Sequence, residues 1–141
     1  LPFSDATFAL TSCIAVLHHV ADPAAVRRTL AEMVRVTRPG GRVLVWDHNP
    51  LNPYWPILMR RVPQDTGGER LIPAAEVVAG LQAGGGRPVF VGQCGLVPDF
   101  VPRRLLAGAA VAERLVEATP ILRRLCAHNV VLAVKDGVPV P

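Results

Sequence analysis

Histidines follow directly after two apolar runs of this sequence. His18 and His19 come after the run 8–17, and His48 comes after the run 42–47. Imidazole titrates near neutrality, so we take His18 and His48 as candidate general bases that remove a proton from a hydroxyl or an amine. Because neighbours in sequence do not share a face, at most one of His18 and His19 should face a pocket. A structural role, as a helix cap or a partner of a backbone carbonyl, is the commoner one for any single histidine.

The second run leads into residues that could contact a substrate. Asp47 and Asn49 flank His48, which makes His48 the better candidate on the substrate side. Tyr54 and Trp55 lie in the proline-rich stretch that follows, where they could form an aromatic lid or cover the edge of a sheet. A metal site built from Asp47 and the histidines has no ligand spacing to support it, so we predict no metal.

The two runs predict one βαβ crossover. Residues 8–17 and 42–47 have the composition of strands that are buried on both faces of a sheet. Between them, Asp22 can cap a helix that begins at Pro23, and the stretch 38–41 ends this helix in a sharp turn. Ligands bind at the carboxyl ends of such parallel strands, so both histidine sites should lie side by side.

The rest of the chain continues the alternation of helix and strand. We expect a short helix at 55–61, a helix from Pro73 to about Gln82, a strand at 88–93, a loop at 95–102, a helix at 103–118 that ends before Pro120, and a strand at 127–135. Residues 1–135 are therefore predicted to form part of one domain, followed by a loose tail at 136–141.

Composition restricts the class of protein. Half of the 141 residues are hydrophobic and 18% are charged, as in a globular domain. No apolar run is long enough for a membrane span. The three cysteines, Cys13, Cys94 and Cys126, are far apart and form no CxxC pair. They predict reduced thiols in a cytoplasmic protein.

Arginine supplies most of the formal net charge of +4. Four Arg-Arg pairs lie in segments that we expect to be helical. Because no basic stretch is interleaved with aromatic residues, we predict solvated helix faces and no nucleic-acid partner. The two pairs nearest the C-terminus, Arg103-Arg104 and Arg123-Arg124, could still attract an anionic substrate or a lipid headgroup.

Three motifs occur in order around the predicted crossover. Their residues are Leu1, Pro2, Phe3, Asp5 and Phe8, then Val16, Leu17, His19 and Val20, then Arg35, Arg38, Pro39, Gly40 and Gly41. Together they resemble the fourth- and fifth-strand region of class I S-adenosylmethionine-dependent methyltransferases of the type 11-like group. The stretch after Trp46 also resembles an E-H-N-P-x-N-P segment of one subgroup. The match covers residues 1–53, with departures at Ala9 and Ala15, where the family usually has acidic or polar residues.

The resemblance implies a partial Rossmann-like α/β fold. It would contain strands 4–7 of the seven-stranded methyltransferase sheet, with the last strand antiparallel and helices on both faces. The cofactor would be S-adenosylmethionine. Its adenine would lie along Leu1, Pro2 and Phe3, and its methionine part above Cys13, Ile14 and Ala15, with His19 close by. Core packing is the alternative for these side chains.

The resemblance also implies that the chain belongs to a methyltransferase that lacks part of its cofactor site in this sequence. The first strands of the fold, with the glycine-rich loop and the acid that hold the cofactor, are absent from this sequence. The chain is therefore expected to belong to an enzyme that methylates a small molecule at O, N or C, and to bind the cofactor poorly alone. One alternative is another Rossmann-like enzyme, such as a nicotinamide dehydrogenase. Another is a non-catalytic half-domain that forms a homodimer or an assembly through an exposed sheet edge.

Overall fold

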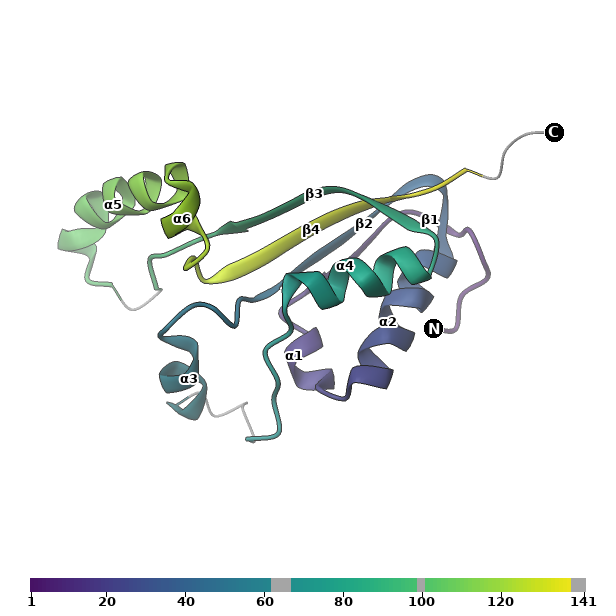
Figure 1. Ribbon diagram of the computed structural model, residues 1–141, viewed down its shortest axis with the longest axis horizontal. Helices are drawn as coiled ribbons and strands as arrows, with labels where there is room; N and C mark the ends of the chain where they lie inside the picture. The colour runs from purple at the N-terminus through teal and green to yellow at the C-terminus, as the bar shows by residue number, and fades with distance from the viewer. Residues whose placement is uncertain (62–66, 99–100, 138–141) are drawn as a thin grey trace.

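The computed structural model describes residues 1–61, 67–98 and 101–137, and its centre is a mixed four-stranded sheet (Figure 1). The strands are β1 (Phe8–Ile14), β2 (Thr37–His48), β3 (Gly86–Cys94) and β4 (His128–Lys135), in the spatial order β1-β2-β4-β3. β1 and β2 are parallel, and β4 is antiparallel to both of its neighbours. The predicted antiparallel last strand is confirmed.

The crossover between β1 and β2 has the predicted helix. β1 ends at Ile14, so the strand predicted over 8–17 is too long, and Leu17 instead begins a short helix, α1 (Leu17–Val20), which is followed by α2 (Pro23–Val36). The Asp22 side chain caps α2 by accepting a hydrogen bond of 2.7 Å from the backbone N–H of Ala25. The apolar stripe of α2, which includes Val26 and Leu30, is buried against the sheet. This packing holds α2 against β1 and β2.

β2 begins earlier than the sequence indicates. The predicted sharp turn lies inside the strand as a bulge, since Phe8 pairs with Thr37 while Leu10 pairs with Arg42. Gly40 has a φ of +73°, and a Cβ on Gly41 would lie 2.9 Å from the carbonyl oxygen of Ala9. The glycines therefore let β2 bend while its backbone stays close to β1.

The remaining helices follow the predicted order. α3 (Trp55–Leu58) leads into a 3₁₀ turn (Met59–Arg61), and α4 (Ala74–Ala83) ends at Gly84. A second 3₁₀ turn (Arg103–Leu105) leads into α5 (Leu106–Ala118), and α6 (Pro120–Arg123) adds a helical turn that the sequence analysis missed. Pro120 ends α5 and also begins α6, because the first position of a helix needs no N–H donor. Part of the loop predicted at 95–102 and of the tail at 136–141 lies outside the described residues.

Helices lie on both sides of the sheet (Figure 1). α2 and α4 cover one face, where Val43, Val45 and Val131 are fully buried. The opposite face keeps large apolar side chains exposed, among them Ile14 and Phe90. α5 and α6 lie on that side, at one end of the molecule. None of the helices in the described part of the chain has the length and apolar character that crossing a membrane requires.

Candidate active site

A buried carboxylate joins the carboxyl ends of β1 and β2. Asp47 is 2% exposed. Its Oδ2 accepts hydrogen bonds from the backbone N–H groups of Leu17 (2.6 Å) and His18 (3.3 Å). Its Oδ1 accepts one from the backbone N–H of His48 (2.7 Å) and lies 2.6 Å from Nδ1 of the His18 ring. The expectation that the two histidine sites lie side by side is thereby confirmed.

The electrostatics of this site fix the tautomer of His18. Burial alone would raise the pKa of Asp47, but the hydrogen bonds from the His18 ring and the His48 backbone outweigh it and lower that pKa. Asp47 is therefore a carboxylate at neutral pH and can only accept protons. It follows that Nδ1 of His18 donates to Asp47, which leaves Nε2 of His18 for another partner.

Aromatic rings lie in a row beside the carboxylate, with His18, His48 and Trp55 stacked and His19 tilted by 42° against His18. The ring centroids of His19 and His18 lie 4.0 Å apart, those of His18 and His48 4.2 Å, and those of His48 and Trp55 3.6 Å. Nδ1 of His48 is buried and has no hydrogen-bond partner within the described residues. Burial, and next the neighbouring His18, lower the pKa of His48 to about 4. His48 is therefore neutral at physiological pH.

Acid is expected to destabilise the fold through His48. Unfolded His48 has a pKa near 6.5 and folded His48 one near 4, so the unfolded state binds more protons between these values. The free energy of unfolding should fall as the pH falls from about 6.5 to 4, by roughly 1–2 kcal/mol after allowance for the partial exposure of the ring. Urea denaturation of the wild type and of His48→Phe, which keeps a ring against Trp55, measures this. The prediction is wrong if both proteins lose stability equally over that pH range.

The same cluster has the residue types of a metal site. Ligand atoms of His18, Asp47 and His48 all lie within 4.8 Å of one another. However, backbone N–H groups already occupy both oxygens of Asp47. The rings of His18 and His48 are also only 21° from parallel, so their in-plane lone pairs do not converge on one ion. The arrangement suits proton transfer better than metal coordination, and the absence of a metal stays a prediction.

Three side chains tie the loop after β2 to the segment before β4. Nδ2 of Asn49 donates to the carbonyls of residues 124 and 126, at 2.8 and 2.7 Å. Nδ2 of Asn52 donates to the carbonyl of residue 125, and Nε1 of Trp55 to that of residue 127. The amide oxygens of Asn49 and Asn52 each accept from a backbone N–H two residues on. Sequence reasoning missed Asn52, although two Asn-Pro steps three residues apart are typical of such Asx turns.

Most of the residues predicted to bind a substrate are buried. Asn49 is 1% exposed, and Asp47 and Trp55 are also buried. Their hydrogen bonds are made within the protein, which favours a role in positioning the loop over direct contact with a substrate. Tyr54 is half-buried, with its ring centroid 5.2 Å from that of Trp55. Substrate contact by these residues stays a prediction.

The predicted cofactor residues fall into two groups. Ile14, exposed at the end of β1, and Ala15 lie beside the His18 site. Ala15 has a φ of +52°, and its N–H donates to the carbonyl of Trp46 at 2.8 Å. Cys13 instead points into the core, and burial raises the pKa of its thiol to about 11. His19 is partly exposed, 3.9 Å from a carboxylate oxygen of Glu69.

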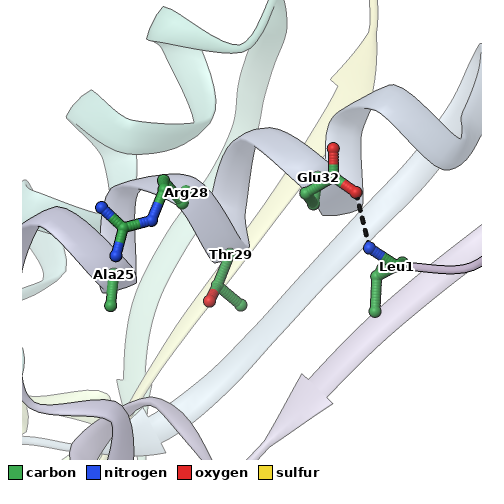
Figure 2. A pocket seen from close by; sticks show the side chains of 5 residues that line it. All are labelled: Leu1, Ala25, Arg28, Thr29 and Glu32. Atoms are coloured by element: carbon green, nitrogen blue, oxygen red, sulfur yellow. Dashed lines mark hydrogen bonds and ion pairs between the residues drawn. The ribbon is translucent and has the colours of Figure 1, made fainter.

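The second group is the exposed segment 1–3. The guanidinium of Arg35 in α2 holds it by donating to the carbonyls of Leu1 (3.2 Å) and Phe3 (3.0 Å). A shallow pocket of about 240 Å³ lies between Leu1 and one side of α2. Figure 2 shows the residues that line it, which are Leu1, Ala25, Arg28, Thr29 and Glu32. None of them belongs to the His18–Asp47 site, so this pocket is a separate feature.

An apolar hollow of about 230 Å³ lies on the open face of the sheet. It is lined by Trp46, Phe90, Gly92, Gln93, Cys94 and Val130. The Phe90 ring lies directly over Gly92, where a Cβ would come within 2.6 Å of it. Burial, and next Glu117, raise the pKa of the Cys94 thiol to about 11, so the hollow is uncharged. Pairing of β2, β4 and β3 assembles this hollow from separate segments, which is why the sequence did not indicate it.

Comparison with known proteins identifies the fold. Residues 1–45 match the model of a family described as a methyltransferase domain. A putative methyltransferase from Haloferax volcanii, solved in complex with the Trm112 methyltransferase activator, superposes on the whole chain with a TM-score of 0.63 at 17% identity. This chain has the fold of the class I methyltransferases. The resemblance noted from the motifs is thus confirmed.

Two further proteins show how much of the chain is similar to methyltransferases. A possible histamine N-methyltransferase from Thermotoga maritima matches 96% of the chain with a TM-score of 0.64 at 14% identity. A demethylmenaquinone methyltransferase from Paenarthrobacter aurescens is 38% identical over 69 residues, or 45% of the chain. The chain spans 26% of the length of that curated relative and 59% of each of the two solved structures.

Proposed function

We propose that the protein transfers a methyl group from S-adenosylmethionine to a small-molecule acceptor, with His18 as the general base. The observation that carries this proposal is the His18–Asp47 pair, which lies at the carboxyl ends of β1 and β2 in a methyltransferase fold. Ligands of open α/β sheets bind at this edge. The comparisons favour this function over that of a nicotinamide dehydrogenase.

The end of β1 fits one wall of a site for the cofactor. Ile14 is exposed there, and the small side chain of Ala15 leaves the left-handed backbone open to close approach. Bound S-adenosylmethionine would supply an electrophilic methyl group. Residues 1–3 are the candidates for the adenine side, as the family resemblance implies. Within the described residues no glycine-rich loop joins a strand to a helix, so we expect the chain to bind the cofactor weakly by itself.

His18 is built to take a proton from the acceptor. Asp47 holds Nδ1 of the ring, which leaves Nε2 as the proton acceptor and would stabilise the imidazolium that forms. The ring is 3% exposed, so the acceptor would have to reach Nε2 inside the protein. His48 stays neutral and stacks between His18 and Trp55. This second imidazole shields one side of the base from water without adding a competing charge. Transfer from a sulfonium otherwise needs mainly alignment and the exclusion of water.

An apolar ring is the acceptor that the surroundings favour. The hollow lined by Trp46 and Phe90 has aromatic walls and lies at the same end of the sheet as His48 and His128. The curated relative with 38% identity is named for demethylmenaquinone. We therefore propose a quinol-like or other aromatic acceptor, methylated at carbon, oxygen or nitrogen, whose proton passes to His18 as the methyl group leaves the sulfonium.

His18→Gln is expected to slow methyl transfer roughly hundredfold or more, because the amide cannot take up the proton. The assay follows transfer of a labelled methyl group from S-adenosylmethionine to a demethylated naphthoquinol, kept reduced under anaerobic conditions, using the chain with any residues that its gene encodes upstream. Arg87→Gln, on the exposed end of β3, is the control and should keep the wild-type rate. A His18→Gln rate within threefold of wild type would exclude His18 as the base. If calorimetry shows no cofactor binding by the wild type with its upstream residues present, the whole proposal fails.

Assembly through β1 is the second candidate function. In the described part of the chain β1 pairs with β2 alone, so its other edge is open to a further strand. A homodimer joined at this edge would complete the sheet. Size-exclusion chromatography of the chain should then show a dimer whose proportion rises with concentration. A clean, stable monomer argues against this candidate.

A further inference from the structure

Helix α5 turns its two acids toward the protein and the apolar side chains of Val111 and Leu115 toward solvent. The carboxylate of Glu113 accepts hydrogen bonds from the backbone N–H groups of residues 96 (2.6 Å) and 97 (2.8 Å). The carboxylate of Glu117, one turn further on, accepts one from residue 95 at 2.8 Å. Both acids are half-buried against this loop. A surface helix ordinarily buries its apolar stripe, so α5 is inverted.

The outward side of α5 is apolar and continues into α6. Val111 and Leu115 lie one turn apart, opposite the two acids, and are 58% and 65% exposed. Ile121 of α6 is 77% exposed. No residue of either helix is buried. We call residues 103–125 the arm. Further exposed apolar side chains at its two ends are Leu105, Leu106, Leu122 and Leu125.

The same segment carries exposed arginines. The exposed cations of the arm are Arg103, Arg104, Arg114, Arg123 and Arg124. The acids of the arm are Glu113 and Glu117, and both bond inward to the loop. The surface presented to solvent therefore combines apolar side chains with positive charge. Figure 1 shows the arm at one end of the molecule, away from α2 and α4.

We propose that this arm docks on the surface of an anionic phospholipid bilayer. Val111, Leu115 and Ile121 would enter the boundary between headgroups and acyl chains, while the arginines bind lipid phosphates. A second copy of the arm is a poorer partner, because two such surfaces would bring like charges together. A nucleic acid would leave the exposed leucines without a partner. The proposal does not depend on methyl transfer, although it would place the protein where apolar acceptors collect.

Cosedimentation of the chain with lipid vesicles tests the proposal. Vesicles of phosphatidylcholine with about a third phosphatidylglycerol should bind the chain, and vesicles of phosphatidylcholine alone should bind it at least tenfold more weakly. Raising the salt concentration should weaken binding, since it screens the arginines. Replacing Arg123 and Arg124 together by glutamine should weaken binding about thirtyfold, from roughly fivefold per cation.

Leu115→Asp tests the apolar contribution and should weaken binding at least tenfold. Ile57→Asp is its matched control, since Ile57 is 59% exposed on α3, outside the arm, and this variant should bind as the wild type does. Equal binding to neutral and anionic vesicles, no binding to either, or an equal loss in the Ile57 control would each overturn the proposal. So would a Leu115→Asp variant that changes only the oligomeric state, because the arm would then be a protein interface.

Discussion

Replacing Asp47 with asparagine is expected to lower the free energy of unfolding by about 3–5 kcal/mol. The carboxylate receives hydrogen bonds from three backbone N–H groups and from the His18 ring, and it is almost fully buried. An amide can accept at one oxygen only, and its own N–H₂ would face donors. Urea denaturation at pH 7, with an unchanged m-value, measures the loss. Methyl transfer should fall as well, since His18 loses the group that fixes its tautomer.

Asp136→Asn is the matched control for this change. Asp136 also pairs with a cation, Arg87, but both side chains are about 60% exposed. Solvent screens such a pair, so the control should cost less than about 0.5 kcal/mol. A loss below 1 kcal/mol for Asp47→Asn would show that the buried bonds contribute little. The carboxylate could then not be the group that holds the two strand ends together.

The crossover was predictable because its signals are local. Asp22 and Pro23 mark a helix start by their own chemistry, and the apolar spacing of α2 fixes the buried side. The bulge at Gly40 and Gly41 was harder to place. A glycine pair indicates a sharp bend, but only the pairing with β1 decides that the bend lies within a strand and not before it.

The candidate site was predicted in part. The positions of His18 and His48 at neighbouring strand ends followed from the βαβ rule, and the structure brings them into contact. The sequence could not show that Asp47 points inward to join them, because that depends on which face of β2 is buried at its end. The contacts of Asn49 reach residues 124–126. Contacts between segments so far apart in the chain leave no periodic pattern in the sequence from which they could be predicted.

The inverted orientation of α5 escaped prediction for a related reason. An apolar stripe ordinarily indicates the buried side of a helix. Here two glutamates bind the N–H groups of the loop after β3, and these bonds turn the apolar side outward. Arg60 and the pairs at 27–28, 103–104 and 123–124, which the sequence placed on solvated helix faces, are exposed, while the side chain of Arg61 lies outside what the structure describes. The two pairs in the arm indicate a membrane-binding surface only when they are considered together with its exposed leucines.

Asn49→Ala is expected to cost about 2–4 kcal/mol and to lower the melting temperature by roughly 10 °C. The change leaves the carbonyls of residues 124 and 126 and the N–H of residue 51 without their partner in a buried region. It should also release the loop that holds Trp55 against His48. Thermal unfolding followed by circular dichroism measures the shift, and the fluorescence of Trp55 reports the loop.

Asn49→Asp separates the contribution of the hydrogen bonds that Asn49 donates from that of the one it accepts. Aspartate keeps an oxygen for the N–H of residue 51 but turns a negative oxygen toward two carbonyls. It should therefore be at least as destabilising as alanine, although its shape is unchanged. Leu51→Ala, in the exposed part of the same loop, should change stability by less than about 0.5 kcal/mol. If aspartate is tolerated, the two carbonyls do not depend on Asn49, and the loop must be held mainly by Asn52 and Trp55.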